Sequence, residues 1–107
     1  MVDLRIQLIT FAGCPNAAAA RAMIERTLSE AGIAARIEEV DTSAPGAPAS
    51  LDEWGSPTIL VNGIDVGGEA EPSGPSCRLY RDANGGTRGV PPDELLMSAL
   101  KRAIGRR

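Results

Sequence analysis

Hydrophobic and polar positions change their period twice in the first part of the chain. Apolar and polar residues alternate over DLRIQLIT, which predicts a strand over residues 3–10. Apolar residues then recur every three or four positions over residues 16–31, which predicts a helix with Gly32 as its left-handed stop. A second short strand is predicted over residues 34–40. This part of the chain is therefore expected to form a β-α-β unit with two parallel strands.

Turn residues predict the remaining elements. Asn62-Gly63 lies between two apolar runs rich in β-branched residues, and this pair favours the tight turn of an antiparallel hairpin. Residues 77–90 predict an additional hairpin, and residues 91–107 predict a helix that starts near Pro92 and stops at Gly105. The order is then β-α-β-β-β-α with an extra hairpin before the last helix. We expect an α/β fold with a central mixed sheet flanked by helices.

Length and charge narrow the kind of protein. A chain of 107 residues fits a single domain over residues 1–107 with a true hydrophobic core. Its formal charge of −3 argues against nucleic acid or an anionic membrane as a partner. No apolar run approaches the roughly 20 residues that span a bilayer, and the amino terminus lacks the pattern of a targeting segment. We expect a cytoplasmic protein that is a monomer or a weak dimer.

The chain has two cysteines and no histidine. Catalytic arrangements that need an imidazole, such as Ser-His-Asp or Cys-His, are therefore excluded. Two thiols alone also argue against a structural zinc site. We expect no metal site and no cofactor, and the obvious reactive group that remains is a thiol.

Cys14 lies in the segment TFAGCPN, between the first predicted strand and the first predicted helix. The partial positive charge and unpaired N–H groups of a helix start favour a thiolate. Pro15 is suited to the first turn of that helix. Free cysteine is also among the most buried residue types, so a small buried side chain beside a tight turn is the alternative.

Three separated motifs resemble one protein family. FAGCPNAAAARAMI, then GSPTILVNGIDV, then SCRLY followed by GVPP occur in the order found in small thioredoxin-like proteins with a Gly-Cys-Pro-Asn active-site segment. Some of those proteins carry selenocysteine at the cysteine position, and they are often labelled as related to alkylmercury lyase. The resemblance covers residues 4–104 and implies a thioredoxin-like fold.

The resemblance also implies roles for individual residues. It makes Cys14 the nucleophile and Pro57 a cis-proline, with the backbone of Ser56 bonding extended substrates; an ordinary proline at a strand start is the alternative. Ala17 stands where thioredoxin has its second cysteine, so a Cys-x-x-Cys disulfide is excluded. Cys77 is then the one internal candidate for resolving a mixed disulfide, unless it is a buried strand residue.

Three further side chains are weaker candidates. Trp54 could flank a substrate groove next to the Ser-Pro pair or pack in the core. Arg78 and Arg81 could stabilise a thiolate or hold the carboxylates of a small thiol, or they could be solvated charges on a strand.

The sequence thus predicts a thioredoxin-like thiol oxidoreductase. Cys14 would attack a disulfide, a peroxide or another soft electrophile, and Cys77 or an external thiol would resolve the product. Two alternatives stay open. The two thiols could hold a soft metal ion or an organomercurial, or the chain could be a thioredoxin-fold interaction domain in which neither thiol reacts.

Overall fold

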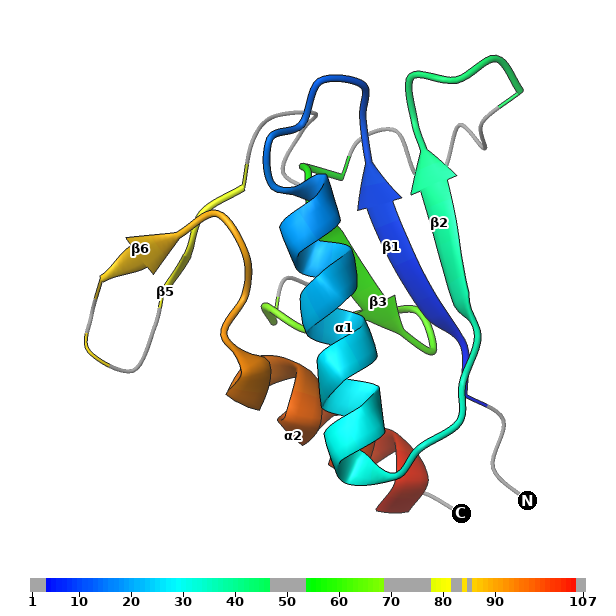
Figure 1. Ribbon diagram of the computed structural model, residues 1–107, viewed down its shortest axis with the longest axis vertical. Helices are drawn as coiled ribbons and strands as arrows, with labels where there is room; N and C mark the ends of the chain where they lie inside the picture. The colour runs from blue at the N-terminus through cyan, green and yellow to red at the C-terminus, as the bar shows by residue number, and fades with distance from the viewer. Residues whose placement is uncertain (1–3, 47–53, 69–77, 82–83, 85, 106–107) are drawn as a thin grey trace.

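The computed structural model describes residues 4–46, 54–68, 78–81, 84 and 86–105, and Figure 1 shows their arrangement. The elements are β1 (Ile6–Thr10), α1 (Ala17–Ala31), β2 (Ile37–Asp41), β3 (Thr58–Val61), β4 (Ile64–Asp65), β5 (Tyr80–Arg81), β6 (Thr87–Arg88) and α2 (Asp93–Gly105). In this part of the chain, β1 to β4 form a mixed sheet in the order β2-β1-β3-β4, and β5 and β6 form a separate two-stranded sheet. The α/β class and the mixed sheet are as expected from the sequence.

β1 organises the four-stranded sheet. It pairs in parallel with β2, with Thr10 opposite Asp41, and antiparallel with β3, with Ile9 opposite Thr58. The carboxyl ends of β1 and β2 therefore meet at the end of the sheet where β3 begins. The loop that carries Cys14 leaves the sheet at this end.

The turn between β3 and β4 has the conformation that its residues predict. Asn62 has a φ of 52° and Gly63 a φ of 83°, and a two-residue turn with positive φ at both positions matches the twist of a hairpin. The Asn62 side chain also accepts a hydrogen bond of 2.8 Å from the Arg5 N–H, and its own N–H donates to the Arg5 carbonyl. The turn is thereby tied to the start of β1.

Both described helices cover the same face of the sheet, and they pack against each other (Figure 1). The main core combines side chains of β1, β3, α1 and α2, among them Ile6, Leu8, Ile59, Val61, Ile24, Leu28, Leu96 and Leu100. Each large apolar side chain buried in this way stabilises the fold by about 1.5–3 kcal/mol. The opposite face carries a smaller cluster of Ile9, Trp54 and Leu60. The sequence predicted helices flanking the sheet, whereas these two helices share one face.

The two ends of α1 are capped in different ways. At the carboxyl end, Gly32 has a φ of 69° and its N–H donates to the carbonyls of Leu28 and Ser29, as the sequence predicts. At the amino end, Asn16 is the N-cap residue, but its side chain makes no capping hydrogen bond among the described residues. It instead lies against the backbone of Gly89, where a Cβ atom would collide with it. The helix starts at Ala17, one residue later than predicted.

Other boundaries differ from the sequence-based prediction by a few residues. β1 begins at Ile6 and not at residue 3, and β2 spans Ile37–Asp41 and not residues 34–40. The additional hairpin is present as β5 and β6, and α2 begins directly after Pro92. No described helix is long and apolar enough to cross a membrane.

Replacing Leu96 by alanine should lower the free energy of unfolding by about 2–5 kcal/mol, because the side chain is fully buried between α2 and the sheet. Leu79→Ala is the matched control, since Leu79 is 70% exposed and its loss should change stability by less than about 0.5 kcal/mol. Urea unfolding followed by the fluorescence of Trp54, the one tryptophan of the chain, measures both. Equal losses in the two variants would contradict this description of the core.

Candidate functional site

Cys14 lies in a tight turn between β1 and α1. Its N–H donates to the Phe11 carbonyl at 3.2 Å, and Gly13 has a φ of 83°, a conformation that glycine adopts without strain. The thiol is free and partly exposed. Cys14 is located two residues before the N-cap Asn16, so the side chain stands in front of the helix and not within its first turn.

Hydrogen bonds fix this turn to the neighbouring loop after β2. The Ala12 N–H donates to the Ser43 hydroxyl at 2.9 Å, and that hydroxyl donates to the Asp41 carboxylate at 2.5 Å. The Thr42 N–H donates to the Thr10 carbonyl at 2.8 Å, which extends the pairing of β1 with β2. The backbone on the amino-terminal side of Cys14 therefore has defined partners.

The peptide bond between Ser56 and Pro57 is cis, as the family resemblance implies. The register of β1 with β3, continued by one residue beyond Ile9 and Thr58, places Pro57 beside Thr10. The Ser56-Pro57 segment thus lies next to the strand end from which the Cys14 turn departs. Both Ser56 and Pro57 are fully buried.

Residues 78–80 cover the backbone of this segment. The Arg78 N–H donates to the Ser56 carbonyl at 2.9 Å, and the Tyr80 hydroxyl donates to the Pro57 carbonyl. The resemblance assigns the backbone of Ser56 to substrate binding, and the carbonyl of that residue is here bonded within the chain. The Ser56 hydroxyl is also buried, and it has no hydrogen-bond partner among the described residues.

A buried ion pair holds residues 78–80 in place. The Arg78 guanidinium donates to both carboxylate oxygens of Asp65, at 2.8 and 3.1 Å, and the two side chains are 7% and 0% exposed. The same guanidinium donates to the Thr58 hydroxyl at 3.1 Å and stacks over the Tyr80 ring at 4.5 Å from its centre. A two-pronged pair of this kind combines charge with a fixed geometry. Arg78 is therefore not a solvated strand charge, and its guanidinium is bonded to the Asp65 carboxylate.

The backbone of Gly67 approaches this cluster closely. A Cβ atom at Gly67 would lie 2.9 Å from Arg78 Nη2 and 3.0 Å from Tyr80 Cε1. A larger residue at this position would displace the guanidinium or the ring. The sequence signal for the cluster is the pair of glycines directly after Val66, a pattern that by itself indicates only a turn.

The other predicted site residues have different outcomes. Trp54 is 8% exposed and packs with Ile9 and Leu60, so most of its ring belongs to the core. Cys77 and the side chain of Arg81 lie outside the described residues. Within the described part of the chain, no group of three or more acidic, cysteine or histidine residues is placed to hold a metal ion.

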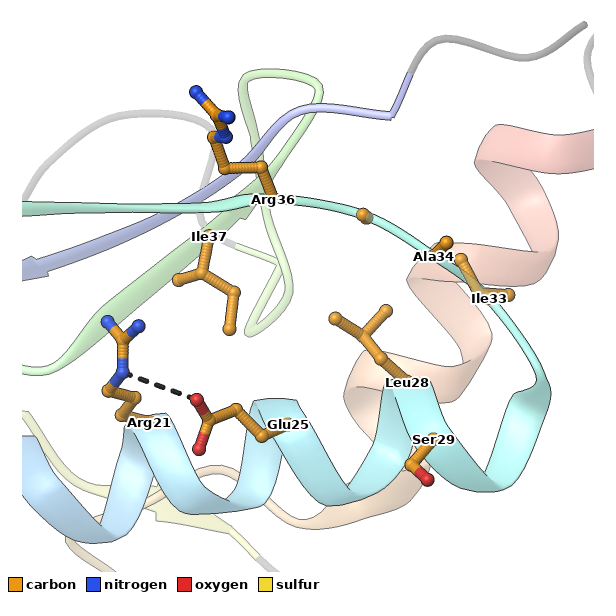
Figure 2. A pocket seen from close by; sticks show the side chains of 9 residues that line it. Arg21, Glu25, Leu28, Ser29, Ile33, Ala34, Arg36 and Ile37 are labelled. Carbon is orange, nitrogen blue, oxygen red and sulfur yellow. Dashed lines mark ion pairs between the residues drawn. The ribbon is translucent and has the colours of Figure 1, made fainter.

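An open groove of about 480 Å³ lies between the outer side of α1 and the segment that leads into β2 (Figure 2). Leu28, Ile33 and Ile37 supply its apolar lining, and Arg21 stands at one end. Arg21 pairs with Glu25 and with Glu39, at 3.5 and 2.6 Å. Neither Cys14 nor the Ser56-Pro57 segment contributes to this groove.

Removing one partner of the buried pair should be strongly destabilising. Asp65→Ala leaves the Arg78 guanidinium buried without its counter-charge, so we expect a loss of about 3–5 kcal/mol in the free energy of unfolding. The double variant Asp65→Leu with Arg78→Met removes both charges and should lose markedly less. Urea unfolding of the two variants measures the difference, and an equal loss would show that the charges are not what matters.

Stability should also fall in acid through Asp41. The Ser43 side chain and backbone N–H both donate to this carboxylate, which lowers the pKa of Asp41 below its ordinary value of 3.8. A lowered folded-state pKa stabilises the fold above the ordinary value, and that contribution is lost as the pH falls through the lowered pKa. Unfolding measured between about pH 5 and pH 3 should have a shallower pH dependence in Asp41→Asn. An unchanged slope would contradict this assignment.

No protein-family profile, no curated protein and no solved structure matches this chain.

Proposed function

We propose that the protein is a thioredoxin-like thiol-disulfide oxidoreductase whose reactive group is Cys14. The observation that carries this proposal is the free, partly exposed thiol in the turn between β1 and α1, at the end of the sheet where three strand ends meet. Loops at the carboxyl ends of strands are the usual place for function in open α/β sheets. The turn is held by hydrogen bonds of the Cys14 and Ala12 N–H groups, and Cys14 is itself partly exposed.

The arrangement of the elements supports the thioredoxin-like part of the proposal. A β-α-β unit with parallel strands is followed by an antiparallel hairpin, and a last helix packs beside the first. A thioredoxin-like fold with the reactive cysteine in its first strand-to-helix loop accounts for this order. The Gly-Cys-Pro-Asn resemblance points to the same loop.

The chemistry requires two thiol-exchange steps. The Cys14 thiolate attacks one sulfur of a disulfide, a new S–S bond forms at Cys14, and the other sulfur leaves as a thiolate that takes up a proton. If the second thiolate is Cys77, it attacks the Cys14 sulfur, the bound half leaves as a thiol, and the resulting Cys14–Cys77 disulfide is reduced by two equivalents of an external thiol. If the second thiolate is external, it attacks the sulfur of the bound half, which leaves as a disulfide with the external thiol, and Cys14 is released as a thiolate. Ala17 stands three residues after Cys14, where a Cys-x-x-Cys disulfide would need its second cysteine. The second thiol must therefore come from Cys77 or from a small external thiol.

This thiol chemistry indicates the cellular compartment in which the protein would act. A thiol that must return to its reduced form after each cycle requires a reducing environment, which the cytoplasm supplies. We therefore place the activity there, with a disulfide-containing substrate and an external thiol as partners.

The first test is adduct formation with bis(hydroxyethyl) disulfide. We expect a mixed disulfide on Cys14, formed at least about tenfold faster than on a free cysteine peptide at the same pH, because the thiol stands before the partial positive charge of a helix start. Mass spectrometry of the intact and digested protein identifies the modified residue. Cys14→Ser should abolish the adduct, and Cys77→Ser should leave its formation unchanged while slowing its resolution if Cys77 is the second thiol. If the mixed disulfide forms no faster on Cys14 than on the free cysteine peptide, the proposal is wrong.

A further inference from the structure

The backbone beside the Cys14 turn is closed by the chain itself. The Ser56 and Pro57 carbonyls accept hydrogen bonds from the Arg78 N–H and the Tyr80 hydroxyl, and both residues are fully buried. An extended polypeptide binds a protein backbone by donating and accepting such main-chain hydrogen bonds at an open edge. Residues 78–80 already occupy that position on the Ser56-Pro57 segment.

The covering segment is held by a contact that is costly to release. The Arg78 side chain is anchored to Asp65 and Thr58, and the Tyr80 ring lies against the guanidinium. Lifting residues 78–80 from the Ser56-Pro57 segment would separate two buried charges as well as break the hydrogen bonds. A competing peptide strand would have to compensate for all of these contacts.

A second set of contacts joins the chain that follows this segment to the start of α1. The Asn16 side chain lies against the backbone of Gly89, just after β6. Arg26 of α1 donates to Asp93 at the start of α2, at 3.0 and 3.2 Å. The chain from β5 to α2 is therefore attached on both sides of the hairpin, near the Ser56-Pro57 segment and near the helix that follows Cys14.

We propose that this closed edge restricts Cys14 to low-molecular-mass disulfides and excludes extended polypeptide disulfides. The inference rests on the proposed function, because it assigns the substrate class of the same thiol. A small disulfide needs only access to the partly exposed sulfur. A polypeptide would in addition need the backbone groups that Arg78 and Tyr80 already use.

The experiment compares two substrates with the full chain. The small substrate is bis(hydroxyethyl) disulfide, and the large one is a disulfide-linked dimer of a short unstructured peptide. For each substrate, the rate constant of mixed-disulfide formation on Cys14 is divided by the rate constant of the same disulfide with a free cysteine peptide. We expect the normalised value to be about tenfold or more higher for the small disulfide, since the peptide gains no backbone hydrogen bonds and meets a covered edge. If both reactions depend on Cys14 but the two normalised rate constants are equal, or the peptide disulfide has the higher one, the inference is overturned and the proposed function is not. If neither disulfide reacts through Cys14, the proposed function fails first.

Two further measurements test the covering segment directly. In the wild-type protein the Arg78 amide should exchange with solvent slowly, because it is bonded to a buried carbonyl, and rapid exchange would contradict the closed edge. Asp65→Asn weakens the ion pair that holds Arg78. It should therefore raise the ratio of the normalised rate constant of the peptide disulfide to that of the small disulfide. Glu38→Gln is the matched control, since Glu38 also pairs with an arginine, Arg5, but at the surface, and it should leave the ratio unchanged. A ratio that moves equally in both variants, or in neither, would also overturn the inference.

Discussion

The buried ion pair between Arg78 and Asp65 determines how the second half of the chain is arranged. Asp65 is fully buried on β4, where an isolated carboxylate would be very unfavourable, so the fold requires a cation at this place. Arg78 supplies it and so brings residues 78–80 against the start of β3. From there the chain continues through β5 and β6 to Gly89, which lies against Asn16. One polar contact thus connects the sheet to the segment that borders the first helix.

The Cys14 turn is held by contacts on both sides. On one side the Ser43 hydroxyl bonds the Ala12 N–H, and on the other the Asn16 side chain lies against Gly89. Cys14, between these two contacts, is a free cysteine of intermediate burial. The turn that carries the proposed reactive group therefore has defined partners on both sides.

Local patterns in the sequence were enough to predict the elements but not the contacts between them. The alternation in β1, the helical spacing in α1, Gly32 and the Asn62-Gly63 turn each act within a few residues, and all four match the structure. The Arg78–Asp65 pair joins residues 13 positions apart across a glycine- and proline-rich stretch with no periodicity, so no pattern indicates it. The contact made by the Asn16 side chain is not indicated by the local sequence for a similar reason. Asn16 is a favourable capping residue, but a contact with distant Gly89 takes its side chain.

An ion pair has a consequence at this position that an apolar contact would not have. Apolar side chains tolerate small shifts of one segment along another, whereas a guanidinium bonded to both carboxylate oxygens has one geometry. A shift of residues 78–80 by one position would bring Leu79, now 70% exposed, to Asp65 and leave the carboxylate buried without a cation. The pair therefore sets the register in which the Arg78 N–H reaches the Ser56 carbonyl and the Tyr80 hydroxyl reaches the Pro57 carbonyl. Closure of the backbone edge beside the thiol depends on that register, and so on the one buried charge of β4.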